Sequence, residues 1–161
     1  MKSPLAFLTL VILISPAVAE KGDREFFCEA EATAGIGTNG GDKWTGAAFD
    51  SSSSKFVLKL AYVDNSIRTT WDKKLESITE YKVLVRPKDS ERAFSCGQDS
   101  APANTILGPD ETFVCAFSPF EIKFNLQSRR YLQIFWGSFL DGDSSTNKSP
   151  YIQAGRCTRI D

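Results

Sequence analysis

Hydrophobic and polar residues alternate along much of the chain. The clearest case is the segment 55–63, where four large apolar residues share one face: Phe56, Leu58, Leu60 and Tyr62. Segment 121–126 repeats this pattern, and after a polar break at 127–130 the run 131–140 is apolar or aromatic at nearly every position. A period of two predicts a strand with one buried face, whereas a continuous apolar run is typical of a central strand covered on both faces. The two segments therefore predict a β-hairpin in the middle of a sheet.

Six further segments have the pattern of short strands and are separated by residues that favour turns. They are 25–34, 44–49, 81–86, 92–96, 112–117 and 151–160. In the first of them, the alternation places Cys28 on the inward face. Roughly eight to ten strands with turns every 8 to 12 residues predict an all-β fold, which is either an antiparallel β-barrel or a β-sandwich.

The region 64–79 is the one place where a helix competes with a strand. Trp71, Leu75 and Ile78 fall at helical spacing with charged residues between them, which allows one short amphipathic helix. Thr69 and Thr70 favour a strand instead. The sequence leaves both alternatives open here.

The first nineteen residues have the pattern of a signal peptide. Lys2 supplies a positive end, an apolar run of about ten residues follows, and Ala17-Val18-Ala19 has the small-x-small pattern of a cleavage site. The run is shorter than the roughly 20 residues that a membrane-spanning helix needs. We therefore expect cleavage after Ala19, a single β domain over residues 20–161, no membrane insertion, and a periplasmic or secreted location.

Charge and composition limit the partners of the mature domain. It would have 142 residues with 18 basic and 20 acidic side chains, a size that can bury one core by itself. Nucleic acids and anionic membrane surfaces favour a strong positive excess. We therefore expect no nucleic-acid partner, and the expected assembly is a monomer.

The four cysteines all lie in the expected mature domain. An even number of cysteines in an exported chain is typical of a disulfide framework, and four cysteines allow three pairings. We favour Cys96 with Cys115, which closes a local loop, and Cys28 with Cys157, which ties the first strand to the last. The C-x-x-C spacing that is typical of a metal site is absent, so metal binding by these cysteines is not favoured.

Several kinds of catalysis are excluded because the chain has no histidine. Ser-His-Asp and Cys-His arrangements cannot form, and neither can the usual hydrolytic zinc site. Carboxylate pairs remain, but Glu29 with Glu31 fits a solvated strand face, and Asp110 with Glu111 fits a turn.

No metal or other cofactor is expected. The glycine-rich loop 35–43 lacks the phosphate-binding glycine motifs. The loop Asp141–Asn147 starts as a calcium loop does, but it has Thr146 where the loop needs glycine and Ile152 where it needs glutamate.

Tryptophans are the candidate binding residues. Trp44, beside Lys43 and a glycine-rich loop, and Trp71, between Thr70 and Asp72, are those expected to reach the surface, where an exposed Trp is a frequent anchor for a partner. Trp136 lies in the apolar part of the expected hairpin and is expected to be a core residue.

Two stretches near the end of the chain carry a resemblance. They are FVCAFSPFEIKFNLQSRRYLQIFWGSF, residues 113–139, and SPYIQAGRCTRI, residues 149–160. Together with Cys28, Trp44 and Phe49, the central cysteine pair and a final S-P-x-I-x-x-G-x-C, the chain resembles a family of small exported four-cysteine proteobacterial proteins with no known activity. The resemblance implies the disulfide pairing favoured above and a periplasmic or secreted setting. Lipocalins are similar only in architecture, because Gly41-Asp42-Lys43-Trp44 is G-x-x-W where they have G-x-W.

Three functions are compatible with this pattern. The preferred one is an exported, non-enzymatic binding module for an apolar or amphiphilic small ligand, which predicts a preformed cavity lined by aromatic side chains. The alternative is a protein-binding module, for example an inhibitor of an exported hydrolase, which predicts a filled core and an exposed loop with an anchor such as Trp71. Carboxylate catalysis is the third, and it requires a cleft with a perturbed Asp or Glu.

Overall fold

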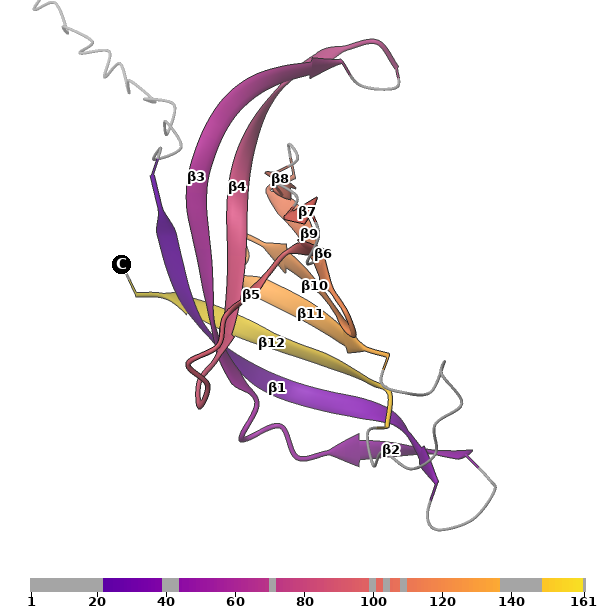
Figure 1. Ribbon diagram of the computed structural model, residues 1–161. Coiled ribbons are helices and arrows are strands. Elements are labelled where there is room, and N and C mark those ends of the chain that lie inside the picture. Colours follow the sequence, from indigo (N-terminus) through magenta and orange to yellow (C-terminus); the bar gives the residue numbers. More distant parts are fainter. Residues whose placement is uncertain are drawn as a thin grey trace, which may run out of the picture.

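Strands make up all the regular secondary structure in the described part of the chain, and no helix occurs there (Figure 1). The computed structural model describes residues 22–38, 44–69, 72–98, 101–102, 105–107, 110–136 and 149–160. The long strands are β1 (Arg24–Thr38), β2 (Trp44–Phe49), β3 (Lys55–Thr69), β4 (Leu75–Pro87), β9 (Thr112–Phe117), β10 (Phe120–Asn125), β11 (Arg130–Phe135) and β12 (Tyr151–Arg159). The short ones are β5 (Phe94–Ser95), β6 (Gly97–Gln98), β7 (Ala101–Pro102) and β8 (Thr105–Leu107). The expected all-β fold is confirmed.

Ten of these strands form one antiparallel sheet. Its order is β5-β4-β3-β1-β12-β11-β10-β9, with β2 beside β1 and β8 beside β4, while β6 and β7 pair with each other. The sheet curls strongly (Figure 1), and within the described residues its end strands β5 and β9 share no ladder of hydrogen bonds. The fold is therefore an open barrel made of one rolled sheet.

The core fills the concave side of this rolled sheet. Along β9, β10, β11 and β12 every second residue is buried or nearly so, which is the alternation of a sheet with one wet face. The residues that are fully covered include Leu58, Leu60, Val83, Ile122, Phe124, Cys28 and Cys115. Both disulfides belong to this same cluster.

The predicted hairpin is confirmed as β10 and β11. The two strands pair from Phe120 opposite Phe135 to Asn125 opposite Arg130, and the turn lies at 126–129, one residue before the expected break at 127–130. The hairpin lies between β9 and β12, nearer one end of the sheet than its middle. Trp136 follows β11 with 46% of its surface exposed, so the prediction that it is a core residue was wrong.

The short helix considered for 64–79 does not form in the described residues. β3 and β4 instead pair as far as Thr69 opposite Leu75. A one-residue register shift between Tyr62 and Asp64 marks a bulge in β3. Cross-strand hydrogen bonds satisfy the backbone without a helix, and the helical spacing of Leu75 and Ile78 therefore has no structural counterpart.

The end of this hairpin extends beyond the rest of the sheet. β1 pairs with β3 only as far as Leu60, and β8 pairs with β4 only at residues 79–81. Residues 66–69 of β3 and 75–78 of β4 therefore form an arm with no third strand beside it in the described part of the chain. Figure 1 shows the arm rising above the sheet and bending over.

The first disulfide, Cys28–Cys157, joins two neighbouring strands at the centre of the sheet. The two cysteines are direct cross-strand partners on β1 and β12. The N–H of Cys157 donates to the carbonyl of Arg129 on the other side of β12, so this is a pair whose backbones do not hydrogen-bond to each other. Cys28 is fully buried, as its inward position in the pattern predicts.

The second disulfide, Cys96–Cys115, joins the two ends of the sheet. Cys96 follows directly after β5, and Cys115 lies in the middle of β9. These two strands are the terminal ones of the sheet order, so the disulfide closes the barrel where backbone hydrogen bonds do not. The pairing was predicted correctly, but only as the closure of a local loop.

Two disulfides fit an oxidising compartment outside the cytoplasm. The expected signal peptide lies outside the described residues. No helix in the described ranges has the length and apolar character needed to span a bilayer.

Removing the second disulfide tests its role as the closure of the barrel. We expect the Cys96→Ala/Cys115→Ala variant to lose about 3 kcal/mol of unfolding free energy, because the bond closes a loop of about 20 residues and also holds β5 against β9. Urea denaturation followed by circular dichroism measures this loss. Hydrogen exchange should show that protection falls mainly in these two strands. A loss spread evenly over all strands would contradict the proposed closure.

Candidate functional site

Five aromatic side chains form a continuous row at one end of the rolled sheet. Strand register produces it, because Phe117 is opposite Phe120, Phe120 is opposite Phe135, and Phe135 is opposite Tyr151. Successive ring centroids lie 5.4, 4.9 and 5.0 Å apart. Phe94 extends the row, with its ring stacked 5.5 Å from that of Phe117. We call these five residues the aromatic row.

The stack of Phe94 on Phe117 joins the same two sheet ends as the second disulfide. Phe94 lies on β5 and Phe117 on β9, two residues from Cys96 and Cys115 respectively. Aromatic pairs of this kind contribute about 0.5–1.5 kcal/mol beyond their buried area. A covalent bond and a ring stack thus fix the position of the row.

A row of uncharged polar side chains lies directly below the aromatic row. It consists of Thr33, Gln133 and Gln153. Gln153 on β12 is the direct cross-strand partner of Thr33 on β1 and of Gln133 on β11. Their exposed fractions are 9%, 9% and 2%. We call these three residues the polar row.

The polar row has hydrogen-bonding capacity to spare. Gln153 Nε2 donates to the hydroxyl of Tyr131 at 2.8 Å. Thr33 Oγ1 is buried and has no hydrogen-bond partner in the described part of the chain. Such an atom costs about 1–3 kcal/mol when nothing satisfies it, and an orphaned buried group in a native protein calls for an explanation such as a functional role or a bound water or ion.

A bulge in β1 turns Thr33 inward. Cys28 and Ala30 are in phase with the core, but the pairing with β12 shifts register between Ala30 and Ala32. Inward positions therefore change from even to odd numbers, which brings in Thr33 and then Gly35.

Two glycines make room for the rings beside these rows. A Cβ on Gly35 would clash with the backbone carbonyl oxygen of Pro150 and would also lie 2.7 Å from Cε2 of Phe49. A Cβ on Gly155 would clash with the backbone carbonyl oxygen of Glu29 and would also lie 2.7 Å from Cε1 of Tyr131. Larger residues would therefore displace the neighbouring backbone as well as both rings.

Two adjoining cavities open onto both rows. Their volumes are about 320 and 510 Å³, within the usual range for small-ligand pockets. The residues that line both are Ser54, Phe120, Tyr151 and Gln153. The smaller cavity also contacts Gln133, Phe94 and Phe117, whereas the larger one contacts Thr33 and Phe49. We call the two together the cleft.

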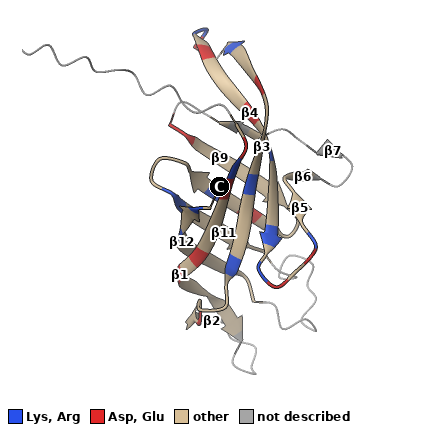
Figure 2. Ribbon diagram, turned by 90° about the vertical axis from the view of Figure 1, so that its left-hand side faces the viewer, with Lys and Arg blue, Asp and Glu red and all other residues tan. Residues whose placement is uncertain are grey.

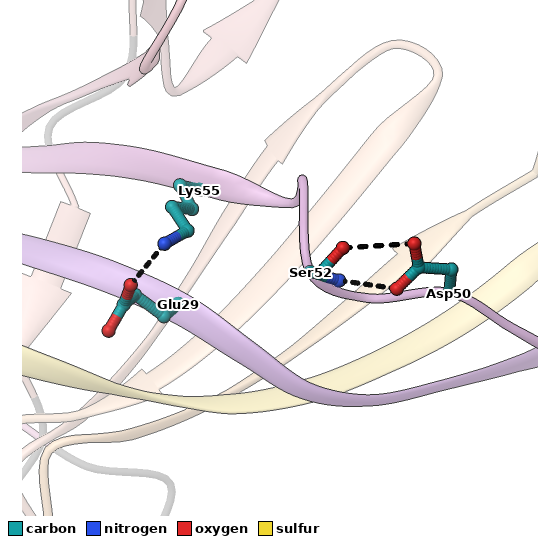
Figure 3. Close-up of polar contacts among 4 residues, drawn as sticks. All are labelled: Glu29, Asp50, Ser52 and Lys55. Atoms are coloured by element: carbon teal, nitrogen blue, oxygen red, sulfur yellow. Dashed lines mark hydrogen bonds and ion pairs between the residues drawn. The ribbon is translucent and has the colours of Figure 1, made fainter.

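The compact turn between β2 and β3 contributes Asp50 and Ser54 to the lining of the cleft. Figure 3 shows Asp50 and Ser52 of this turn. The carboxylate of Asp50 accepts hydrogen bonds from the backbone N–H and the hydroxyl of Ser52, both at 2.9 Å. These two bonds lower the pKa of Asp50 below 3.8. Beyond the turn, Lys55 forms an ion pair with Glu29 at 2.7 Å (Figure 3).

The carboxylates considered for catalysis do not line the cleft. Glu29 pairs with Lys55, and Glu31 pairs with Arg156 at 2.9 Å, on an exposed strand face. Both acidic and basic residues occur on the strands seen in Figure 2. Asp110 accepts a hydrogen bond from the N–H of Thr112 in the turn before β9. Their expected roles as a solvated face and a turn are confirmed.

The two predicted tryptophan anchors remain predictions. Trp44 begins β2 with its backbone opposite Thr38, but its side chain lies outside the described part. Trp71 lies outside it altogether, between the ends of β3 and β4.

The described ranges contain no group of three or more His, Cys, Asp or Glu side chains that could hold a metal ion. The loop Asp141–Asn147 is not among the described residues.

No protein-family model, curated protein or solved structure matches the chain.

The tyrosines of the site provide a test of its burial. Burial raises the pKa of Tyr131 and of Tyr151 above 10.0. A raised pKa means that the folded state favours the neutral phenol. The contribution of the two tyrosines to the free energy of unfolding is therefore complete below pH 10, and it is lost as the pH rises through their pKa values in the folded protein.

We expect Tyr131 and Tyr151 to ionise late in an alkaline titration followed by phenolate absorbance. Tyr151→Phe should remove one late step and leave the other. A titration in which Tyr151→Phe removes no late step would contradict the burial of this site.

Proposed function

We propose that the protein is an exported, non-enzymatic binding module that holds an amphiphilic small molecule in the cleft. The observation that carries the proposal is the aromatic row directly above the polar row in one cavity system. A ligand could place its apolar body against the rings of Phe120 and Tyr151 and its polar group towards Gln153.

The aromatic row supports binding of an apolar surface. Burial of apolar surface contributes about 25 cal/mol per Å², and flat rings add contact area with little loss of conformational freedom. Phe120 and Tyr151 are only partly buried in the structure, so both keep surface that a ligand can cover.

Strand pairing and a disulfide hold the residues of the site in place. Strand register fixes the row on β9 to β12, and the Cys96–Cys115 bond holds β5 against it. A preorganised site loses little entropy when it binds, and more of the contact energy therefore appears as affinity.

Carboxylate catalysis is less well supported than binding. Asp50 lines the cleft, but its pKa is lowered by Ser52, whereas a general acid at neutral pH needs a raised pKa. The candidate pairs at Glu29 and Asp110 lie on other surfaces. For these reasons we propose binding.

A fluorescence titration with N-phenyl-1-naphthylamine, a neutral amphiphile, tests the proposal. We expect a saturable rise in emission with one site per chain. Phe120→Ala should weaken binding about tenfold, because it removes a ring that contacts both Phe117 and Phe135 and about 1.4 kcal/mol corresponds to a factor of ten.

Val114→Ala is the matched control. Val114 is an apolar strand residue whose side chain is 47% exposed and does not line the cleft. This variant should bind as tightly as the wild type. If the wild-type protein does not bind the probe, or if Phe120→Ala and Val114→Ala lose the same affinity, the cleft is not the binding site.

Exposed apolar residues on the arm favour a second candidate function, which is binding of a protein with an apolar surface. Ile67 and Leu75 are 73% and 74% exposed and share one face of the arm, since they pair with Ser77 and Thr69. Exposed apolar side chains this close together are frequent at protein interfaces.

An Ile67→Ser/Leu75→Ser variant separates the two functions. It should bind the naphthylamine probe normally but lose any exported protein that co-purifies with the wild type. If the variant keeps that protein, the arm is not the contact.

A further inference from the structure

The charges around the cleft are balanced, which limits the polar group that it can accept. Lys55, which lines the smaller cavity, is ion-paired with Glu29. Lys88 and Asp89 are neighbours of opposite sign at its rim. Asp50, at the larger cavity, is fully exposed and accepts its hydrogen bonds from Ser52.

The buried end of the cleft has hydrogen-bonding groups but no charge. Thr33, Gln133 and Gln153 make up the polar row, and nine-tenths or more of each is covered. A carboxylate or ammonium group moved there would lose its water without gaining a counter-ion, which is strongly unfavourable. An uncharged polar group has a much smaller cost, and hydrogen bonds can offset it.

The available atoms can both donate and accept hydrogen bonds. Thr33 Oγ1 has no partner within the described residues, and a hydroxyl can act as donor and as acceptor. The Nε2 of Gln153 is bound to Tyr131, which leaves its Oε1 as an acceptor for an incoming donor. Gln133 adds a complete amide at the smaller cavity.

We propose that the cleft binds its ligand with an uncharged group that both donates and accepts hydrogen bonds, such as a primary amide, inserted towards the polar row. Thr33 is the residue that recognises this group, and the apolar body of the ligand lies against the aromatic row. The inference rests on the proposed function and adds to it the chemical class of the ligand and its orientation.

Three probes with one ring system and different polar groups test the inference at pH 8. They are 2-naphthamide, 2-naphthoate and 2-methylnaphthalene, titrated by fluorescence into the full disulfide-bonded protein. We expect the amide to bind about tenfold more tightly than either of the others. The naphthoate is weaker because its charge is uncompensated, and the methyl compound is weaker because it leaves the polar row unsatisfied.

The outcomes separate the two proposals. If none of the three probes binds and the naphthylamine probe also fails, the proposed function is wrong. If the naphthoate or the methyl compound binds as tightly as the amide, the cleft is a binding site but the inference about the uncharged group is overturned.

Thr33→Val tests the residue itself. Valine has nearly the same shape and lacks the hydroxyl, so the preference for the amide over the methyl compound should fall about five- to tenfold. The free protein should be as stable as the wild type or more stable, because an unsatisfied buried hydroxyl has been removed. A merely structural role for the hydroxyl would show the reverse, with lower stability and an unchanged preference.

Thr33→Ser is the matched control. It keeps the hydroxyl and loses only a methyl group, and should keep the preference for the amide. If Thr33→Val retains the full preference, or if Thr33→Ser loses as much of it as Thr33→Val, Thr33 does not recognise the uncharged group.

Discussion

The contact between the two ends of the sheet is the constraint on which the rest of the molecule depends. Backbone hydrogen bonds hold each strand to its neighbours, but they give β5 and β9 no ladder to share. The Cys96–Cys115 bond and the stack of Phe94 on Phe117 make this connection through side chains. Without it the sheet could unroll, the core would lose one side, and the smaller cavity would lose a wall. The same disulfide and ring stack therefore close the barrel and shape the cleft.

Strand register is the second determinant of the site. Residues that are direct partners across adjacent strands line up in layers on the inner face, so that one layer is aromatic and the next is polar. A slip of one residue in any strand would turn its inward set outward. Gln153 illustrates this, because it is opposite Gln133 on one side and Thr33 on the other. The pairing of β12 with β1 and β11 therefore determines which side chains line the cleft.

Local patterns account for what could be predicted from the sequence. The β10–β11 hairpin, the inward position of Cys28 and both disulfide pairings follow from alternation and composition. Gln153 was also within reach, since it is in phase with Cys157 on one strand, yet it was not recognised as a site residue. Thr33 could not have been found, because the bulge that turns it inward depends on pairing with β12. The helix considered near Leu75 failed for a similar reason, since pairing with β3 outweighed its spacing.

The neighbouring positions of β1 and β12 have a consequence for the order of events during folding. The first and last long strands are partners at the centre of the sheet, and their disulfide links residues 129 positions apart. During synthesis from the N-terminal end, the β3–β4 and β10–β11 hairpins can form early, whereas one edge of β1 stays unpaired until β12 has been made. The barrel is therefore completed only after β12 has been synthesised, and high contact order of this kind slows folding.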